Sequence, residues 1–187
     1  MEQYSLREIT CFKAYDVRGR IPDQLNEEIA YRIGQAYAAF IKPKEVVVGF
    51  DIRLSSKSLC EALIRGLTDS GVDVSNIGQC GTEEIYFATS FLGVDGGIVV
   101  TASHNPKDYN GIKFVRENSK PVSADTGLVE IRQLAEKNEF DMASKKGRVS
   151  QVDVKKDYIK HLLSYIDINN LEPLTVLCNA GNGGAGP

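Results

Sequence analysis

Residues 97–114 read GIVVTASHNPKDYNGIKF, a β-branched apolar run that ends in a loop rich in polar side chains. The apolar part predicts a buried strand at residues 96–102, and the loop begins at the carboxyl end of that strand. Residues 111–117 form a second apolar run, and because the connection is too short for a crossover helix, we expect it to return antiparallel. Open α/β sheets bind ligands beyond the carboxyl ends of their strands, so the loop is a candidate functional site.

Strands and helices alternate in the residues before this stretch. Apolar β-branched runs predict strands at residues 45–50 and 72–78, and helical spacing predicts helices at 27–41, within 55–71 and within 81–93. Strands joined through helices make right-handed crossovers, which predicts a three-layer α/β fold with a mixed, mostly parallel sheet and helices on both faces. The expected N-cap residues are Asn26, Ser56 and Thr82.

The residues after the loop predict two more helices. One lies within 123–140, a polar link follows at 141–151, and the second helix spans 155–166. We expect one α/β domain at residues 1–166, and at 167–187 a linker that leads into the first strand of a truncated second domain. The apolar side chains expected to face inward on the last helix are Tyr158 or Ile159, Leu162 and Ile166.

The final residues, GNGGAGP, allow two interpretations. Accessible backbone N–H groups in a glycine-rich turn can cradle a phosphate, but neither G-x-x-x-x-G-K-[ST] nor a G-x-G-x-x-G followed by a helix is present. A plain tight turn is therefore the favoured interpretation.

Charge and composition exclude several classes of protein. The chain has 187 residues with 22 Lys and Arg against 25 Asp and Glu, a net charge of -3, so it offers no basic field for nucleic acid. The N-terminus MEQYSLREIT has no signal pattern and the apolar runs are strand-sized, so we expect a cytoplasmic protein without membrane contact. The four cysteines lack C-x-x-C spacing and are expected to be free thiols.

Ser103 and His104 stand side by side in the polar loop. A Ser-His hydrolase is disfavoured, because neighbours on an extended backbone point in different directions and no G-x-S-x-G elbow is present. The residue types alone leave two interpretations open: a loop that carries chemistry, or a polar turn that Ser103 merely caps.

The whole string TASHNPKDYNGIK, residues 101–113, resembles the active-site serine loop of the α-D-phosphohexomutase family. FKAYDVRG at 12–19, GFDIR at 49–53 and GTEEIYFAT at 81–89 resemble further segments of that family in the expected order. Within the family, these segments look most like those of the bacterial phosphomannomutases. A phosphoglucosamine mutase would more typically have the sequence DNGIKFF after its serine loop, so Tyr109 argues against that branch. A phosphoglucomutase of the same family remains an alternative.

The resemblance implies a phosphohexomutase that converts mannose 6-phosphate to mannose 1-phosphate for GDP-mannose and surface polysaccharide. It implies Ser103 as the phosphoserine carrier, Lys113 as general base or acid, and Arg18 as support for Lys113 or the phosphate. His104 would line the pocket with a proton-handling role, and Tyr15 would border the sugar phosphate. A serine ester can hold the phosphoryl group between two transfers, and positive charge stabilises the anionic transition state.

The family also implies Mg²⁺, bound through a phosphate oxygen on Ser103, and a hexose 1,6-bisphosphate as activator and intermediate. Its other metal ligands come from a D-G-D-x-D-R loop, a string that this sequence does not contain. We therefore expect domains II to IV of the same polypeptide as partners, and little or no mutase activity from this chain alone. The competing hypothesis is a non-catalytic module that binds a sugar phosphate or a protein.

Two further interpretations concern residues outside the proposed chemistry. Asp51 and Arg53 are expected to form a structural pair that shapes the loop beside the serine. His161, between a lysine and a leucine in the last helix, is expected to be an interfacial histidine.

Overall fold

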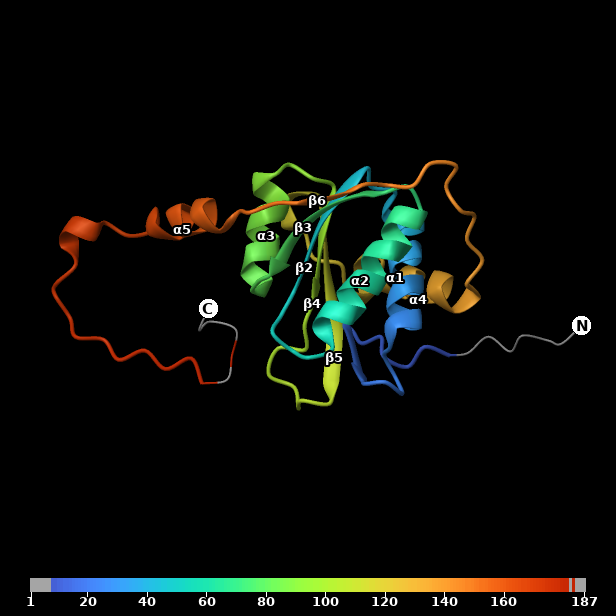
Figure 1. Ribbon diagram of the computed structural model, residues 1–187, viewed down its shortest axis with the longest axis horizontal. Coiled ribbons are helices and arrows are strands. Elements are labelled where there is room, and N and C mark those ends of the chain that lie inside the picture. Colours follow the sequence, from blue (N-terminus) through green and yellow to red (C-terminus); the bar gives the residue numbers. More distant parts are fainter. Residues whose placement is uncertain (1–7, 182, 184–187) are drawn as a thin grey trace, which may run out of the picture.

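Alternating apolar residues in the central strands supply cores on both faces of one sheet. The computed structural model describes residues 8–181 and 183. In β2 (Glu45–Phe50), Val46 and Val48 pack into one cluster and Val47 into another. Because successive side chains of a strand point to opposite faces, both faces of the sheet must be covered by helices. Figure 1 shows the sheet between the two helical layers.

The sheet has six strands in the order β1-β5-β4-β2-β3-β6. β2 pairs in parallel with β3 (Asp73–Gln79) and β4 (Gly96–Val100), and β3 pairs in parallel with β6 (Val149–Gln151). β5 (Tyr109–Arg116) runs antiparallel to β4 and to β1 (Val17–Arg20). The predictions of a mixed, mostly parallel sheet and of an antiparallel return after the polar loop are confirmed.

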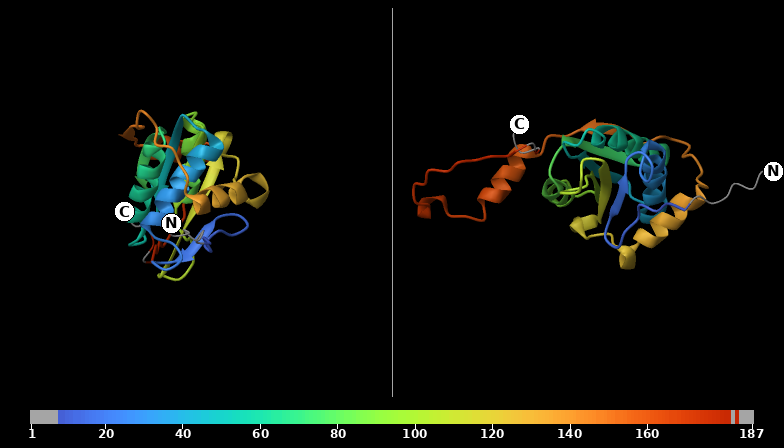
Figure 2. Two further views of the ribbon diagram at one scale, coloured as in Figure 1. Left: turned by 90° about the vertical axis from the view of Figure 1, so that its right-hand side faces the viewer. Right: turned by 90° about the horizontal axis from the view of Figure 1, so that it is seen from below.

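Three helices cover one face and α3 (Thr82–Phe91) covers the other, as the views in Figure 2 show. α1 (Glu27–Ile41) and α2 (Ser56–Asp69) pack closely, since a Cβ on Gly34 would lie 2.5 Å from the carbonyl of Leu63. α4 (Leu128–Lys137) packs beside α1. None of the helices in the described part of the chain has the length and hydropathy of a membrane span.

Two of the three expected helix caps are shifted by one residue. Asn26 caps α1 as predicted, and its side chain accepts a hydrogen bond from the N–H of Ile29 at 3.0 Å. The N-cap of α2 is Ser55 rather than Ser56, whose hydroxyl binds Asp51 instead. The N-cap of α3 is the residue before Thr82, and the carboxylate of Glu84 caps it by accepting from its N–H.

The polar link at 141–151 contains a strand that the sequence did not predict. β6 has three exposed residues and no apolar alternation, and its strand structure comes from pairing with the edge of β3. The expectation that a strand begins after the linker, within 167–187, is wrong for residues 171–181. Those residues have no regular structure, because a strand needs a hydrogen-bonded neighbour and none of the described residues pairs with them.

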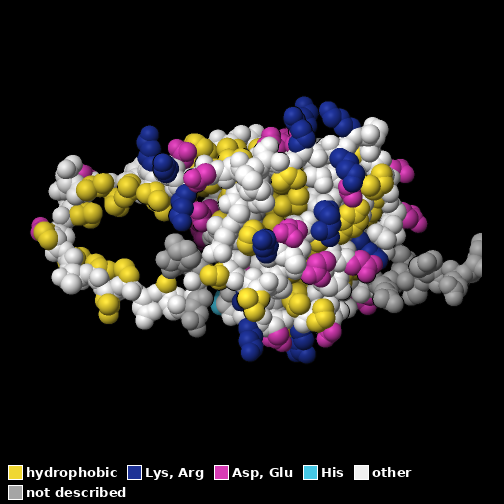
Figure 3. Space-filling view, in the orientation of Figure 1, with side chains coloured by type: hydrophobic (Ala, Val, Ile, Leu, Met, Phe, Trp, Pro, Cys, Tyr) yellow, Lys and Arg dark blue, Asp and Glu magenta, His cyan; other side chains and the backbone are white. Residues whose placement is uncertain are grey.

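α5 (Lys155–Leu163) lies at the margin of the molecule rather than in a core. Ile159, Leu162 and Ile166 are 45–48% exposed, so the prediction that they face inward is wrong. The helix contacts α3 on one side only, through Tyr158 and His161, and no described element covers its opposite side. Figure 3 shows exposed apolar side chains along the segment beyond this helix. The 1–166 and 167–187 domain division stays a prediction.

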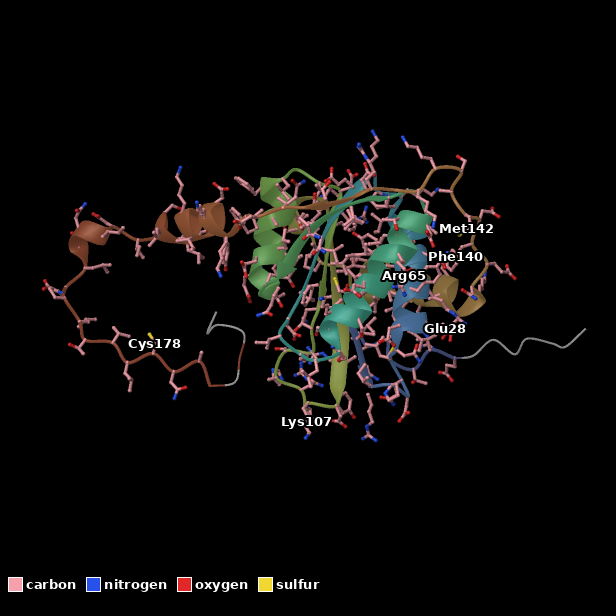
Figure 4. All side chains as sticks on the ribbon, viewed as in Figure 1. Glu28, Arg65, Lys107, Phe140, Met142 and Cys178 are labelled. Atoms are coloured by element: carbon pink, nitrogen blue, oxygen red, sulfur yellow. The ribbon has the colours of Figure 1, made fainter. Side chains whose placement is uncertain are left out.

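The four cysteines are unpaired, as expected. Burial raises the pKa of the Cys11, Cys60 and Cys80 thiols to about 12. Cys178 is exposed on the segment after α5, far from the sheet in Figure 4.

A buried tyrosine ties α1 to the sheet. The Tyr37 hydroxyl donates to the carbonyl of Val115 at 2.9 Å, and its ring stacks on Phe114. Burial raises the pKa of this phenol, so the hydroxyl stays a donor.

We predict that Tyr37→Phe lowers the free energy of unfolding by about 1 kcal/mol, because the Val115 carbonyl loses a donor that water cannot replace. Urea denaturation measures the change. Tyr15→Phe, at a side chain 77% exposed, is the matched control and leaves the midpoint unchanged. Equal midpoints for the two variants would contradict the prediction.

Candidate functional site

Ser103 follows β4 at the carboxyl edge of the sheet, on the connection to β5. Its backbone N–H donates to the Thr101 hydroxyl at 3.0 Å, and its φ of +53° lies in the left-handed region. This conformation costs a non-glycine residue about 1 kcal/mol or more and persists only when surrounding contacts enforce it. The serine is exposed, and its Oγ lies 3.4 Å from Nδ1 of the exposed His104. The loop therefore displays a hydroxyl on a constrained backbone.

Arg53 supplies the contacts that enforce the loop conformation. Its Nη2 donates to the carbonyls of Ser103 at 2.9 Å and Asn105 at 2.5 Å. Its Nη1 donates to the carbonyls of Pro106 at 2.8 Å and Tyr109 at 2.9 Å. One planar guanidinium thus binds four backbone oxygens of the loop, which fixes the path of the chain on both sides of the serine.

Asp51 holds Arg53 in place. Its Oδ1 accepts from the backbone N–H of Arg53 at 3.0 Å, and its Oδ2 lies 3.5 Å from Nε of the guanidinium. The Asp51 backbone N–H donates to the carbonyl of Val100, so the pair is anchored at the end of β4. The interpretation of Asp51 and Arg53 as a structural pair that shapes the serine loop is confirmed.

A second group of charged side chains, Asp16, Arg18 and Lys113, lies at the β1–β5 pair and is separate from the Arg53 contacts. Oδ2 of Asp16 accepts from Nζ of Lys113 and from Nε of Arg18, both at 2.9 Å. Nη1 of Arg18 also lies 3.4 Å from the carbonyl of Ala102 and donates to Oδ1 of Asn105. Arg18 is therefore in direct contact with the serine loop, and Lys113 is linked to it through Asp16.

A cleft of about 1010 Å³ opens beyond the carboxyl ends of β2, β3 and β4. Ser103, Asn105 and Lys107 of the loop line it, and Lys107 extends from the outer tip of the loop in Figure 4. The cleft faces the Arg53 side of the loop. Residues after β2, after β3 and at the start of α3 also line it: Asp51, Ile52, Leu54, Cys80, Thr82 and Glu84.

The structure brings together only part of the predicted site. Arg18 and Lys113 share the Asp16 carboxylate, and Arg18 contacts the serine loop at Ala102 and Asn105. His104 lies beside the Ser103 hydroxyl. Tyr15 is 77% exposed on the segment before β1, away from the cleft lining. Their chemical roles stay predictions.

Sequence reasoning missed Asp16 and Asn105. A signal for Asp16 was present, because residues two apart on a strand share a face and Asp16 precedes Arg18 by two positions. Asn105 gave no such signal, since its contact with Arg18 joins residues far apart in the sequence. Asn110 is fully buried, and its amide donates to the hydroxyls of Ser55 and Ser56, which fastens the end of the loop.

The described residues contain no group of three His, Cys, Asp or Glu side chains placed to hold a metal ion. A magnesium site complete within residues 8–181 does not fit this arrangement.

The chain matches a family model described as phosphoglucomutase/phosphomannomutase, alpha/beta/alpha domain I, over residues 10–142. A phosphomannomutase of Escherichia coli strain K12 is 56% identical over 184 residues, 97% of this chain and 40% of that protein. A phosphomannomutase of Klebsiella pneumoniae is 59% identical over 156 residues, 82% of this chain and 99% of that sequence. The chain thus spans about 40% of the length of the Escherichia coli relative.

Among solved structures, the chain is similar to a phosphoglucomutase/phosphomannomutase family protein from Burkholderia thailandensis. The TM-score is 0.74 at 34% sequence identity, and the match covers 82% of this chain and 35% of that one.

We predict that Arg53→Lys releases the serine loop while the sheet stays folded. A lysine is a point charge without the planar fork, and it cannot bind four carbonyls at once. The Asn105 and Tyr109 amides, which donate to the carbonyls of Ala102 and Pro106, report the change through hydrogen exchange. We expect at least tenfold faster exchange at both, equivalent to about 1.4 kcal/mol of local stability.

Arg65→Lys is the control for this experiment, at an exposed arginine on α2. It should leave the exchange of both loop amides unchanged. Unchanged exchange in Arg53→Lys as well would show that other contacts hold the loop.

Proposed function

Because the chain belongs to the phosphoglucomutase/phosphomannomutase family, whose domain I model it matches, we propose that Ser103 is the phosphate carrier of a phosphohexomutase. The observation that carries this proposal is the exposed Ser103 hydroxyl on a backbone that Arg53 fixes at four carbonyls. A carrier serine must be reachable by a sugar hydroxyl and held still for in-line transfer. The loop meets both requirements.

The proposed transfer moves one phosphoryl group between Ser103 and a hexose. In the direction that loads the serine, the Ser103 oxygen bonds to phosphorus while the bond from phosphorus to the sugar oxygen breaks. The ammonium of Lys113 gives a proton to the departing sugar oxygen, the Ser103 proton passes to His104, and the reverse transfer returns both protons. The ammonium is the form of Lys113 that faces the Asp16 carboxylate. Arg18 supplies positive charge beside the loop, where the transition state is anionic.

His104 and Tyr15 have supporting parts in this proposal. His104, with its ring nitrogen 3.4 Å from the serine Oγ, exchanges a proton with the hydroxyl when Ser103 releases or regains phosphate. The exposed Tyr15 borders the sugar phosphate when it is bound.

The proposed substrates are mannose 6-phosphate and mannose 1-phosphate, with a hexose 1,6-bisphosphate as activator and intermediate. The names of the relatives support mannose, since those at 56% and 59% identity are phosphomannomutases. The product would supply GDP-mannose for surface polysaccharide. Phosphoglucomutase activity is the second candidate, because the family description includes both activities.

Mg²⁺ is the proposed cofactor, with one ligand from a phosphate oxygen on Ser103. It would neutralise the phosphate and its leaving oxygen. The described residues do not offer the remaining ligands, so the proton and phosphoryl steps above are assigned to this chain's residues alone.

We place this reaction in the cytoplasm, without nucleic acid or membrane as partner. The four unpaired cysteines support a reducing compartment. The net charge of -3 supports a small anionic substrate held by local cations rather than a nucleic acid. Further domains of the same polypeptide are the proposed partners, as most of the length of the Escherichia coli relative lies outside the match.

We predict that the chain gains one phosphate on Ser103 when it is incubated with glucose 1,6-bisphosphate and MgCl₂. Intact mass and peptide sequencing measure the product. Ser103→Ala gains none, and Ser144→Ala, at an exposed serine in the polar link, behaves as the unmodified sequence does. Phosphate binding without transfer would favour a non-catalytic module, and reaction of Ser103 with a fluorophosphonate probe would favour a hydrolase.

We also predict that this chain alone does not convert mannose 6-phosphate, and that a chimera does. In the chimera the chain replaces the matching part of the Escherichia coli phosphomannomutase, whose remaining length would supply groups that the described residues lack. Coupled enzyme assays measure mannose 1-phosphate, with Ser103→Ala in the chimera as control. Turnover by the chain alone, or a folded chimera without turnover, would contradict this.

A further inference from the structure

We propose that Asp16 is a positioning residue for phosphoryl transfer, which fixes Lys113 and Arg18 as a working pair of cations beside the serine loop. This inference rests on the proposed function. A single oxygen, Oδ2 of Asp16, accepts from both cations at 2.9 Å. No other carboxylate among the described residues forms an ion pair with two cations of the serine site.

The strand register places these three residues together. β1 pairs with β5 through Val17 opposite Ile112, and continuing that register by one residue puts Asp16 opposite Lys113. Arg18 lies in β1, two residues after Asp16, which immediately precedes the strand, and its Nε donates to Oδ2 of Asp16. All three side chains therefore meet beside the β1–β5 pair.

Gly111 lets the backbones of β1 and β5 approach each other closely beside this cluster. It lies opposite Arg18 in the β1–β5 pair, and a Cβ there would collide with the carbonyl of Val17 and lie 2.8 Å from the carbonyl of Thr101. From this position the arginine extends to the carbonyl of Ala102 and the side-chain oxygen of Asn105. The cation paired with Asp16 is thereby also bound to the loop that carries Ser103.

Asp16 is the most buried member of the cluster that it forms with Arg18 and Lys113. Its side chain is 9% exposed, and a carboxylate this buried is stable only when it is paired and hydrogen-bonded. The side chains of Arg18 and Lys113 are 22% and 24% exposed, so both keep a route to solvent and to a ligand. One carboxylate against two cations leaves a net charge of +1, which still favours a phosphate.

The Asp16→Asn variant distinguishes a positioning role for Asp16 from a purely electrostatic one, because the two roles predict different effects on phosphate binding and on the transfer rate. The substitution raises the net charge of the cluster from +1 to +2, so simple attraction of phosphate is kept or strengthened. The two cations lose the charged acceptor that holds them, and small displacements of catalytic groups lower transfer rates by large factors. Binding and transfer are therefore expected to change in opposite directions.

The first measurement compares phosphate transfer to Ser103 with binding of inorganic phosphate. For Asp16→Asn we expect transfer from glucose 1,6-bisphosphate to slow by about tenfold or more, while the Kd for inorganic phosphate stays equal or falls. Asp16→Glu keeps the charge and should regain part of the rate. Glu28→Gln, at an exposed carboxylate paired with Arg32 on α1, is the control and keeps both values.

An unchanged transfer rate in Asp16→Asn would overturn the proposal. So would parallel losses of transfer, phosphate affinity and melting temperature, because that pattern is the one a purely structural residue gives.

The second measurement does not depend on activity. The Arg18 Nε–H, hydrogen-bonded to Asp16, should exchange slowly with solvent in NMR spectra of this chain, and Asp16→Asn should speed that exchange by at least tenfold. Glu28→Gln should leave it unchanged. If Ser103 never accepts phosphate, the proposed carrier function fails, and the Arg18 signal still decides whether Asp16 positions the arginine. Unchanged exchange in Asp16→Asn overturns the inference.

Discussion

The contact between the Arg53 guanidinium and four backbone carbonyls is the interaction on which the site depends. A loop that presents a reactive hydroxyl has to be exposed, and exposed loops are ordinarily mobile. Arg53 makes this loop rigid while the serine stays exposed, because it binds backbone carbonyls of the loop and does not cover the Ser103 side chain. The left-handed backbone at Ser103 is retained for the same reason.

The loop is held from two sides by groups of different origin. Asp51 and Arg53 lie just after β2, one of the parallel strands, and anchor the loop on the side of the cleft. Arg18 lies in β1 and Asp16 immediately before it, and β1 joins the sheet by antiparallel pairing with β5. The antiparallel strand β5 that follows the loop therefore has a role in the site, because β1 pairs with it and brings Asp16 and Arg18 close to the serine loop.

Most of the fold could be predicted from the sequence, because two-sided burial of β2 and β4 leaves a continuous apolar run that only a covered sheet can accept. β6 could not be predicted, since three exposed residues carry no pattern and their structure depends on the edge of β3. For α5 the helix was predicted correctly and its burial was not, because apolar spacing does not reveal whether another element covers the helix. In the site, Ser103 and Lys113 followed from the motif. The two-residue spacing of Asp16 from Arg18 was a signal in the sequence, but the contact of Asp16 with Lys113 depends on the strand register.

Arg53 and Arg18 have different roles in the site, and the number of N–H donors that each has already engaged distinguishes them. An arginine has five N–H donors. In Arg53 the four Nη donors meet four carbonyls and Nε faces Asp51, so this guanidinium has no donor left for a ligand. In Arg18, Nε and Nη1 are engaged, whereas Nη2 makes no hydrogen bond within the described part of the chain. Arg53 therefore acts on the loop alone, and Arg18 is the arginine that can add a phosphate oxygen without giving up the contacts that position it.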